Sequence, residues 1–253
     1  MKKWFIFLTL MAGFTLYGDN CYSVAKELHT LQNRIVERSY EALRPGAWAA
    51  YKDLNGNRVR AVFVGRERHG GQTLYGIEIS LGRGAPVQMW MRLVDKPVAF
   101  ENRRLVFKTL EPWELYVPFQ GGAMRVGHEA LAAYMRMLGP ELSTILTPAE
   151  IIVPPRCDRV PKVERVTHTL PGGKKIEATK ITDSANGAYV LVSPEVPFGM
   201  VAVDARDGAR QEMTDFGHSG GKVRIGAAMR KQAMPMPVMP GFPGGAPMPR
   251  SLP

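Results

Sequence analysis

The residue types best suited to chemistry are few in this chain, and they form no recognisable catalytic or metal-binding set. No two histidines stand at i and i+4, and none belongs to a metal-ligand motif. Asp215-Phe216-Gly217 lacks the catalytic-loop signature that would make it a kinase motif. This pattern predicts a protein that is not an enzyme and needs no cofactor. The histidines are His29, His69, His128, His168 and His218.

The two cysteines, Cys21 and Cys157, are predicted to form one disulfide. Two thiols are an even count and too few for a four-cysteine zinc site. Cys157 lies in a proline-rich stretch without a neighbouring histidine, which argues against a cysteine nucleophile. The alternative to a bridge is two separate buried thiols.

Three methionines near the C-terminus have a spacing suited to copper. Met234, Met236 and Met239 follow the Met-x-Met-x-x-Met pattern, and soft thioether sulfur suits copper(I). Methionine and proline are abundant in this segment, so composition alone also accounts for the spacing. The segment has no hydrophobic period, and we predict a disordered tail at 229–253 that acts as a spacer or contact segment.

Positive charge dominates the chain. It has 33 Lys and Arg against 23 Asp and Glu, a formal net charge of +10. Arg58, Arg60, Arg66 and Arg68 are predicted to form a basic patch around one hairpin. Such a patch favours an acidic partner, here an anionic envelope surface, unless it is only a solvated basic surface. No nucleic-acid-binding module is recognisable, so nucleic acid is not a predicted partner.

The N-terminus predicts export. Lys2 and Lys3 precede an uncharged apolar run from Trp4 to Tyr17, and Gly18 follows. This order is typical of a Sec signal peptide, predicted here as residues 1–18, and the run is shorter than the ~20 residues of a spanning helix. The mature protein is therefore expected in the periplasm. An uncleaved anchor or a buried N-terminal helix is the alternative.

The rest of the chain up to residue 228 is predicted to be one α+β domain. Val24, Leu28, Leu31 and Ile35 form one apolar stripe of a helix over about 21–43. Short strands separated by turn signals then predict two strand-rich parts, with hairpin turns at Asn55-Gly56 and at Pro171-Gly172-Gly173. These parts cover about 47–120 and 162–216, with a helical segment at about 127–152 between them.

One predicted strand carries a stripe of large apolar side chains. Met89, Met91 and Leu93 share one face, and Trp90 lies on the other. Methionine and aromatic side chains make adaptable walls for apolar ligands. The alternative is ordinary core packing.

Three stretches together resemble those of bacterial exported proteins with the periplasmic lipoprotein-carrier fold. They are Pro45-Gly46-Ala47-Trp48-Ala49-Ala50-Tyr51, the segment 61–67 with Tyr75-Gly76-Ile77-Glu78, and Val196-Pro197-Phe198-Gly199-Met200-Val201. The resemblance extends over about residues 22–216. It implies a curved antiparallel half-barrel sheet that wraps a few helices, and a lipid or lipoprotein acyl chain as the class of ligand. It assigns no site residue.

The sequence thus favours a periplasmic binding or carrier-like protein for an apolar or amphiphilic envelope ligand. Two alternatives stay open. The first is an accessory or structural subunit of an envelope or secretion complex, with an envelope protein as partner. The second is a copper-handling protein that uses the methionine-rich tail.

Overall fold

The computed structural model describes residues 19–236, apart from 54, 83, 101–102, 128–129, 132–160, 183–186 and 205–209. The predicted signal peptide and most of the helical segment at 127–152 therefore lie outside the described residues. The elements are α2 (Asp19–Ala42), β1 (Trp48–Asp53), β2 (Arg58–His69), β3 (Gln72–Leu81), β4 (Val87–Phe100), β5 (Arg103–Phe119), β6 (Gly122–Val126), β7 (Lys162–Thr169), β8 (Lys175–Thr182), β9 (Tyr189–Val192), β10 (Met200–Asp204), β11 (Arg210–Gly217), α5 (Ala227–Lys231) and β12 (Met234–Pro235).

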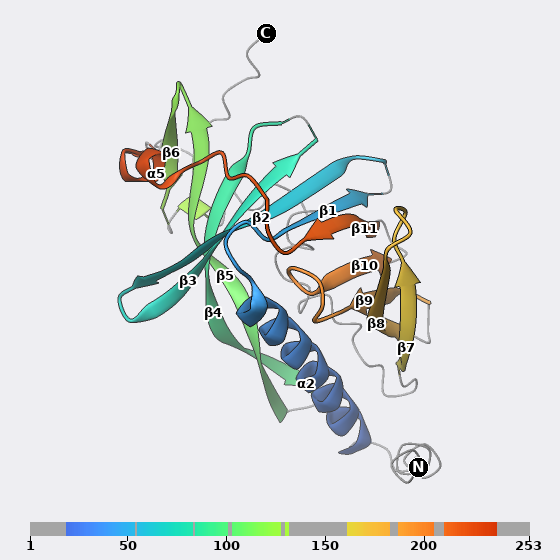
Figure 1. Cartoon of the computed structure of the whole chain (residues 1–253). Coiled ribbons are helices and arrows are strands. Elements are labelled where there is room, and N and C mark those ends of the chain that lie inside the picture. The colour runs from blue at the N-terminus through green and yellow to red at the C-terminus, as the bar shows by residue number, and fades with distance from the viewer. Residues whose placement is uncertain are drawn as a thin grey trace.

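The described strands form one open sheet (Figure 1). Its order is β12-β6-β5-β4-β3-β2-β1-β11-β10-β9-β8-β7, with β12 and β7 at the two edges. Neighbouring strands are antiparallel, except that β12 runs parallel to β6. Pairing of β1 with β11 joins the two strand-rich parts into this one sheet. The prediction of a large antiparallel sheet with few helices is confirmed at this level.

Two predicted hairpin turns form as expected from their residues. At Asn55-Gly56, Gly56 takes a φ of +81°, and the Asp53 carboxylate accepts a 2.7 Å hydrogen bond from the Asn57 backbone N–H. At Pro171-Gly172-Gly173, Gly173 takes a φ of +82° and donates its N–H to the Leu170 carbonyl. Glycine adopts positive φ without steric cost, so these turns are fixed by local sequence.

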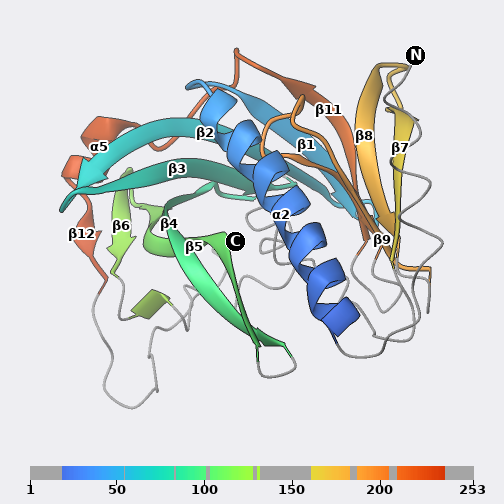
Figure 2. The same cartoon turned by 90° about the horizontal axis from the view of Figure 1, so that it is seen from below.

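The predicted N-terminal helix is confirmed as α2, which packs on one face of the sheet. Ile35 is buried against Val190, Val192 and Ile181 of the β8–β9 region. Tyr40, near the C-terminal end of the helix, belongs to the main buried cluster of the protein. We call this side of the sheet the inner face, and Figure 2 shows α2 on it.

Around β4, the two faces of the sheet carry separate apolar clusters. Met89 and Met91 of β4 point into the main cluster on the inner face and are fully buried. Trp90 points to the opposite side, the outer face, where it packs with Leu74 and Tyr116. The period-2 alternation of the strand therefore fills both sides of the sheet with large side chains.

Strands β4 and β5 are longer than the sequence pattern predicts. The sequence predicts strands at 87–94 and 103–110, but β5 continues to Phe119 through Pro112 and Pro118. A register shift between Trp90 and Met91 lies opposite Pro112, so a bulge takes up this proline within the ladder. Proline is tolerated in a sheet at such irregular positions because no ladder N–H is needed there.

Folded structure also continues past residue 228, where the sequence predicts the end of the domain. Helix α5 spans Ala227–Lys231, and β12 pairs with Met124 and Arg125 of β6. Met236 donates its backbone N–H to the Arg125 carbonyl at 2.9 Å. The predicted tail thus starts too early, because a two-residue edge strand tolerates proline and needs no hydrophobic period. Residues 237–253 lie outside the described residues.

Candidate functional site

The inner face has an aromatic corner where α2 ends. The ring of Tyr40 lies edge-on to Tyr75 of β3 at 5.9 Å and to Phe198 at 6.1 Å between centroids. Phe198 belongs to the turn that precedes β10 and has a φ of +65°. Three distant segments of the chain therefore meet at this corner, and their rings leave it apolar.

Arg66 of β2 brings a cation to the aromatic corner. Its Nη2 donates to the Tyr40 carbonyl at 2.6 Å and to the Glu41 carbonyl at 3.0 Å. These are carbonyls of the last turn of α2, which carry the negative end of the helix dipole. The guanidinium lies 5.5 Å from the Phe63 ring and 5.7 Å from the Tyr75 ring, and the residue stays exposed.

The predicted basic patch is divided between the two faces of the sheet. The register of β2 against β3 shifts between Phe63 and Gly65, and this bulge reverses the alternation of side chains. Arg60, before the bulge, stacks on Trp48 at 4.6 Å on the outer face, whereas Arg66 is on the inner face.

Glycine inside a strand pattern is the sequence signal for this bulge. By the same alternation, Arg58 shares the face of Arg60 and Arg68 that of Arg66.

The predicted apolar wall divides in the same way. Met89 and Met91 are 0 % exposed, so they are packed core residues of the inner face. Leu93 is only partly buried, as are Tyr75 and Val117, and all three pack against the same cluster. Tyr75 and Leu93 lie next to each other on neighbouring strands, and we call these two residues the rim, whereas Val117 follows Tyr116, which pairs with Gln88 near the start of β4. Trp90 contributes to the outer face instead.

Two tyrosines of the inner face are held neutral. Burial raises the pKa of Tyr51, whose hydroxyl donates to the Met200 carbonyl at 3.2 Å. Burial, followed by the neighbouring Tyr51 and Tyr75, raises the pKa of Tyr40. Tyrosine hydroxyls are protonated at neutral pH in any case, and the raised pKa values keep these two uncharged to higher pH as well.

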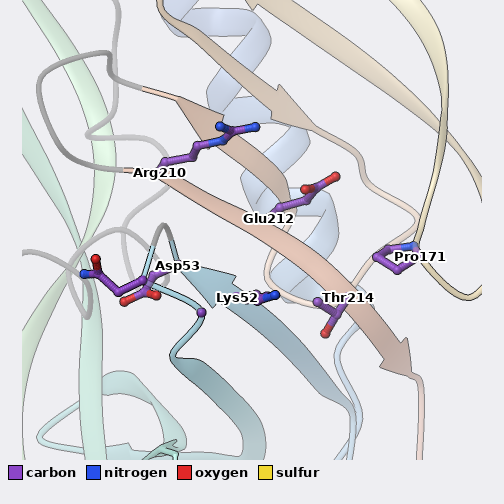
Figure 3. Close-up of a pocket in the computed structure, with 8 residues that line it drawn as sticks. Lys52, Asp53, Pro171, Arg210, Glu212 and Thr214 are labelled. Atoms are coloured by element: carbon purple, nitrogen blue, oxygen red, sulfur yellow. The ribbon is translucent and has the colours of Figure 1, made fainter.

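A polar groove of about 520 Å³ lies where β1, β11 and the β7–β8 turn approach one another (Figure 3). Most of its charged groups already have partners within the protein. Glu212 lies 3.4 Å from His168 Nε2, Arg210 Nε lies 3.9 Å from an Asp204 carboxylate oxygen, and Asp53 is bound by Asn57. No local pattern in the sequence points to this groove, because its walls come from segments far apart in the chain. They are Lys52, Asp53, Asn55, Gly56, Pro171, Arg210, Glu212 and Thr214.

The end of β11 contains the spacing Gly-x-Ser-x-Gly, at Gly217-His218-Ser219-Gly220-Gly221. In α/β-hydrolases this spacing forms a sharp turn from a strand into a helix, which exposes the serine. Here the strand is followed by an irregular segment, and the next helix, α5, begins only at Ala227. The His218 ring lies edge-on to Phe216 at 5.6 Å. The local structure therefore differs from a nucleophile elbow.

The predicted thioether and disulfide sites are only partly described. Met234 is 54 % exposed, Met236 packs against the main cluster, and Met239 lies outside the described residues. Cys157 and the side chain of Cys21 are also outside them, so the bridge stays a prediction. Within the described ranges, no group of three or more His, Cys, Asp or Glu residues is placed to hold a metal ion.

Comparison of the chain with protein-family models, with curated proteins and with solved structures gives no match. Among the residues that the structure describes, no helix is both long and apolar enough to cross a membrane.

Proposed function

We propose that the protein is a non-enzymatic periplasmic binding protein of the carrier type, whose ligand is an apolar or amphiphilic component of the envelope. In this proposal the sheet acts as a half-barrel, with α2 and further helices on its inner face. The ligand enters at the rim made by Tyr75 and Leu93. Apolar side chains at the edge of a larger buried cluster suit a chain-like ligand, since each buried methylene contributes about 0.8 kcal/mol.

The observation that carries the proposal is the place of Arg66 beside this rim. Its exposed guanidinium lies against Tyr75, which is itself a rim residue. An anionic head group at Arg66, with Arg68 on the same face, allows the acyl chain to lie along Tyr75 and Leu93. A cation at the edge of a neutral apolar surface favours an amphiphile over a purely polar ligand.

Calorimetric titration with dodecanoate and with uncharged dodecanol tests this function. We expect both compounds to bind the wild-type protein. Leu93→Glu should abolish binding of both, because a carboxylate at the rim opposes burial of the alkyl chain. Arg66→Gln should weaken dodecanoate about fivefold, which is about 1 kcal/mol, and leave dodecanol within about twofold. Arg58→Gln is the matched control, since it removes the same charge from the outer face. No binding of either compound, or equal binding by Leu93→Glu, would contradict the proposal.

An accessory role in an envelope complex is the second candidate. It is favoured by the C-terminal segment, which reaches the edge of the sheet at β12 and leads to the methionine- and proline-rich residues 237–253. Native mass spectrometry of protein isolated from the periplasm separates the two roles. A co-purifying lipid supports the carrier role, and a partner protein supports the accessory role.

A further inference from the structure

The chain crosses the outer face of the sheet after β11. Figure 2 shows α5 and the adjoining red segment on the side of the sheet away from α2. We call residues 222–236 the strap. It touches strands β2, β3, β4 and β6 at three anchors, and Met229 and Ala233 pack against the apolar cluster of the outer face between them.

The first anchor is a buried carboxylate. Glu78 of β3 is 2 % exposed and accepts two backbone N–H groups of the strap, from Arg224 and Ile225, each at 2.8 Å. Gln88 donates to the Ile225 carbonyl at 2.7 Å and receives the Trp90 indole N–H at 3.1 Å. A carboxylate that accepts successive backbone N–H groups binds the main chain of a peptide, largely whatever its side chains.

The second anchor selects side chains. Ile225 is 0 % exposed and packs with Trp90, Leu74 and Tyr116. Five residues later, Arg230 lies 4.3 Å above the Trp90 ring and donates to Glu67 at 2.6 Å. An aliphatic pocket followed by an aromatic platform with a carboxylate is specific for an apolar residue and a later arginine.

The third anchor is the sheet edge. Met234 and Pro235 pair with β6, and this pairing adds a short parallel strand to an edge that is otherwise open in the described chain. Main-chain pairing of an extended segment with a sheet edge is a recurring mode of peptide recognition.

Charge is complementary across the contact. The strap carries Lys222, Arg224, Arg230 and Lys231 and no acidic residue. The outer face offers it Glu67 and Glu78, although the whole chain has a net charge of +10. The surface therefore fits a basic, extended segment.

The strap is held less firmly than the strands beneath it. Of residues 222–236, only Ile225 is fully buried, and Met229, Ala233 and Met236 are partly buried against apolar clusters. Helix α5 has five residues, no buried side chain and no side-chain cap at its start. Upstream, Gly221 is fixed by donating to the Gly46 carbonyl at 2.8 Å. Segments with few buried contacts open with less free energy than the rest of a protein.

We propose that the outer face of β2, β3, β4 and β6, which its own strap covers, also binds the strap of a second copy of this chain. The strap of a second copy reproduces every anchor, so two molecules that open their straps can exchange them and form a dimer. This interaction uses the outer face and is independent of the ligand proposed for the inner face.

Binding of a peptide to the full-length chain tests the surface directly. The probe is fluorescein-labelled peptide 221–236, followed by anisotropy. The variant Ile225→Ser with Arg230→Ser loosens the strap and leaves the surface intact. It should bind the peptide at least about tenfold more tightly than the wild-type protein, whose own strap competes.

Adding Glu67→Gln to this variant should weaken peptide binding about threefold, and adding Glu78→Gln should weaken it about tenfold, because the buried carboxylate makes the stronger contacts. A peptide of the same composition in scrambled order is the control. Failure of the folded variant to bind the peptide overturns the proposal.

Two measurements on the wild-type protein keep the proposal testable if the variants do not fold. Hydrogen exchange should be at least about tenfold faster at the Ile225 amide than at β3 amides, since strap opening precedes exchange between copies.

Sedimentation equilibrium should show a dimer fraction that rises with protein concentration, and mixed samples of differently labelled protein should exchange subunits. An Ile225 amide that exchanges only with global unfolding, or a monomer at all concentrations up to about 1 mM, overturns the exchange between copies.

Discussion

Single residues decide how the outer face packs, and Gly76 of β3 is the clearest case. A Cβ at this position would lie 2.7–2.8 Å from the Trp90 ring. The ring has little room to move, because its N–H is bound by Gln88 and its face is covered by Arg230. Glycine is therefore required here by close approach, and the strand accepts the loss of a side chain to seat the tryptophan.

We expect Gly76→Ala to lower the free energy of unfolding by about 1–3 kcal/mol, the usual cost of overpacking. Gly172→Ala is the matched control, since a Cβ added at this position of the β7–β8 turn would meet no described heavy atom within 4 Å. Urea denaturation of the two variants measures the difference. Equal stability of both variants would show that Trp90 repacks freely.

The raised pKa of Tyr116 predicts how the stability of the protein depends on alkaline pH. Burial, then its hydrogen bond to Glu114 at 2.7 Å, raises its pKa to about 12 from the ordinary value of 10.0. The folded protein holds this proton more tightly than the unfolded chain. The resulting stability is present in full below pH 10 and is lost as the pH rises to about 12.

Denaturation midpoints measured from pH 8 to pH 12 test this, with absorbance of tyrosinate followed in parallel. The wild-type protein should lose stability more steeply above about pH 10 than Tyr116→Phe. Tyr40 and Tyr51, whose pKa values are also raised, leave a residual slope in the variant. Identical slopes for the two proteins would rule out the role of Tyr116.

Among the elements, α2 depends on a contact from the sheet. Its last carbonyls accept hydrogen bonds from Arg66 of β2, so the strand caps the helix. We expect Arg66→Gln to destabilise the protein by about 1 kcal/mol, in the range for a cation at a helix C-terminus. Thermal unfolding of Arg66→Gln is compared with that of Arg58→Gln, which removes the same charge from the opposite face. The difference between the two variants measures the contribution of the helix cap. Equal melting temperatures for the two variants would contradict a capping role for Arg66.

The elements also show what sequence can and cannot predict. The hairpins at Asn55-Gly56 and Pro171-Gly172-Gly173 follow from local backbone preferences, and the helix over α2 follows from one apolar stripe. The division of the arginines follows only in part, because Gly65 signals a bulge but pairing with β3 sets the register on either side of it. Strand β12 escapes prediction for the same reason, since its partner β6 lies more than 100 positions earlier in the chain.

The same limit holds for the candidate site. Alternation places Met89 and Met91 together, but whether they form a wall or a core depends on what covers them. The aromatic corner brings together Tyr40, Tyr75 and Phe198, and no periodic pattern relates these positions. Contacts of this kind are decided by the order of strands in the sheet.

For the whole molecule, the pairing of β1 with β11 is decisive. It joins strands from the two halves of the chain, and Thr214 donates across it to the Ala50 carbonyl. Tyr51 adds a hydrogen bond to Met200 of β10. Because the ladder runs without a break from β6 to β7, we expect the described sheet to unfold as one cooperative unit.

The predicted Cys21–Cys157 disulfide would act at this same scale. Cys21 lies near the start of α2, and Cys157 precedes the edge strand β7 by five residues, 162 − 157. The bridge would close a loop of 136 residue steps, 157 − 21, that includes the whole of β1 to β6. The chain-entropy model gives about 4–5 kcal/mol for such a loop. This is a large share of the ~5–15 kcal/mol that stabilises a typical domain.

Reduction should therefore lower the melting temperature clearly, and the double variant Cys21→Ser, Cys157→Ser should behave like the reduced protein. The variant controls for effects of the reductant, because adding reductant to it should change nothing further. Thiol titration of the denatured, unreduced protein from the periplasm gives the direct answer. No free thiol, together with a monomer on a non-reducing gel, supports the bridge, whereas two free thiols per chain contradict it. A bridge would also require the Cα atoms to lie within about 7 Å, so it would fix the start of α2 next to the residues that lead into β7.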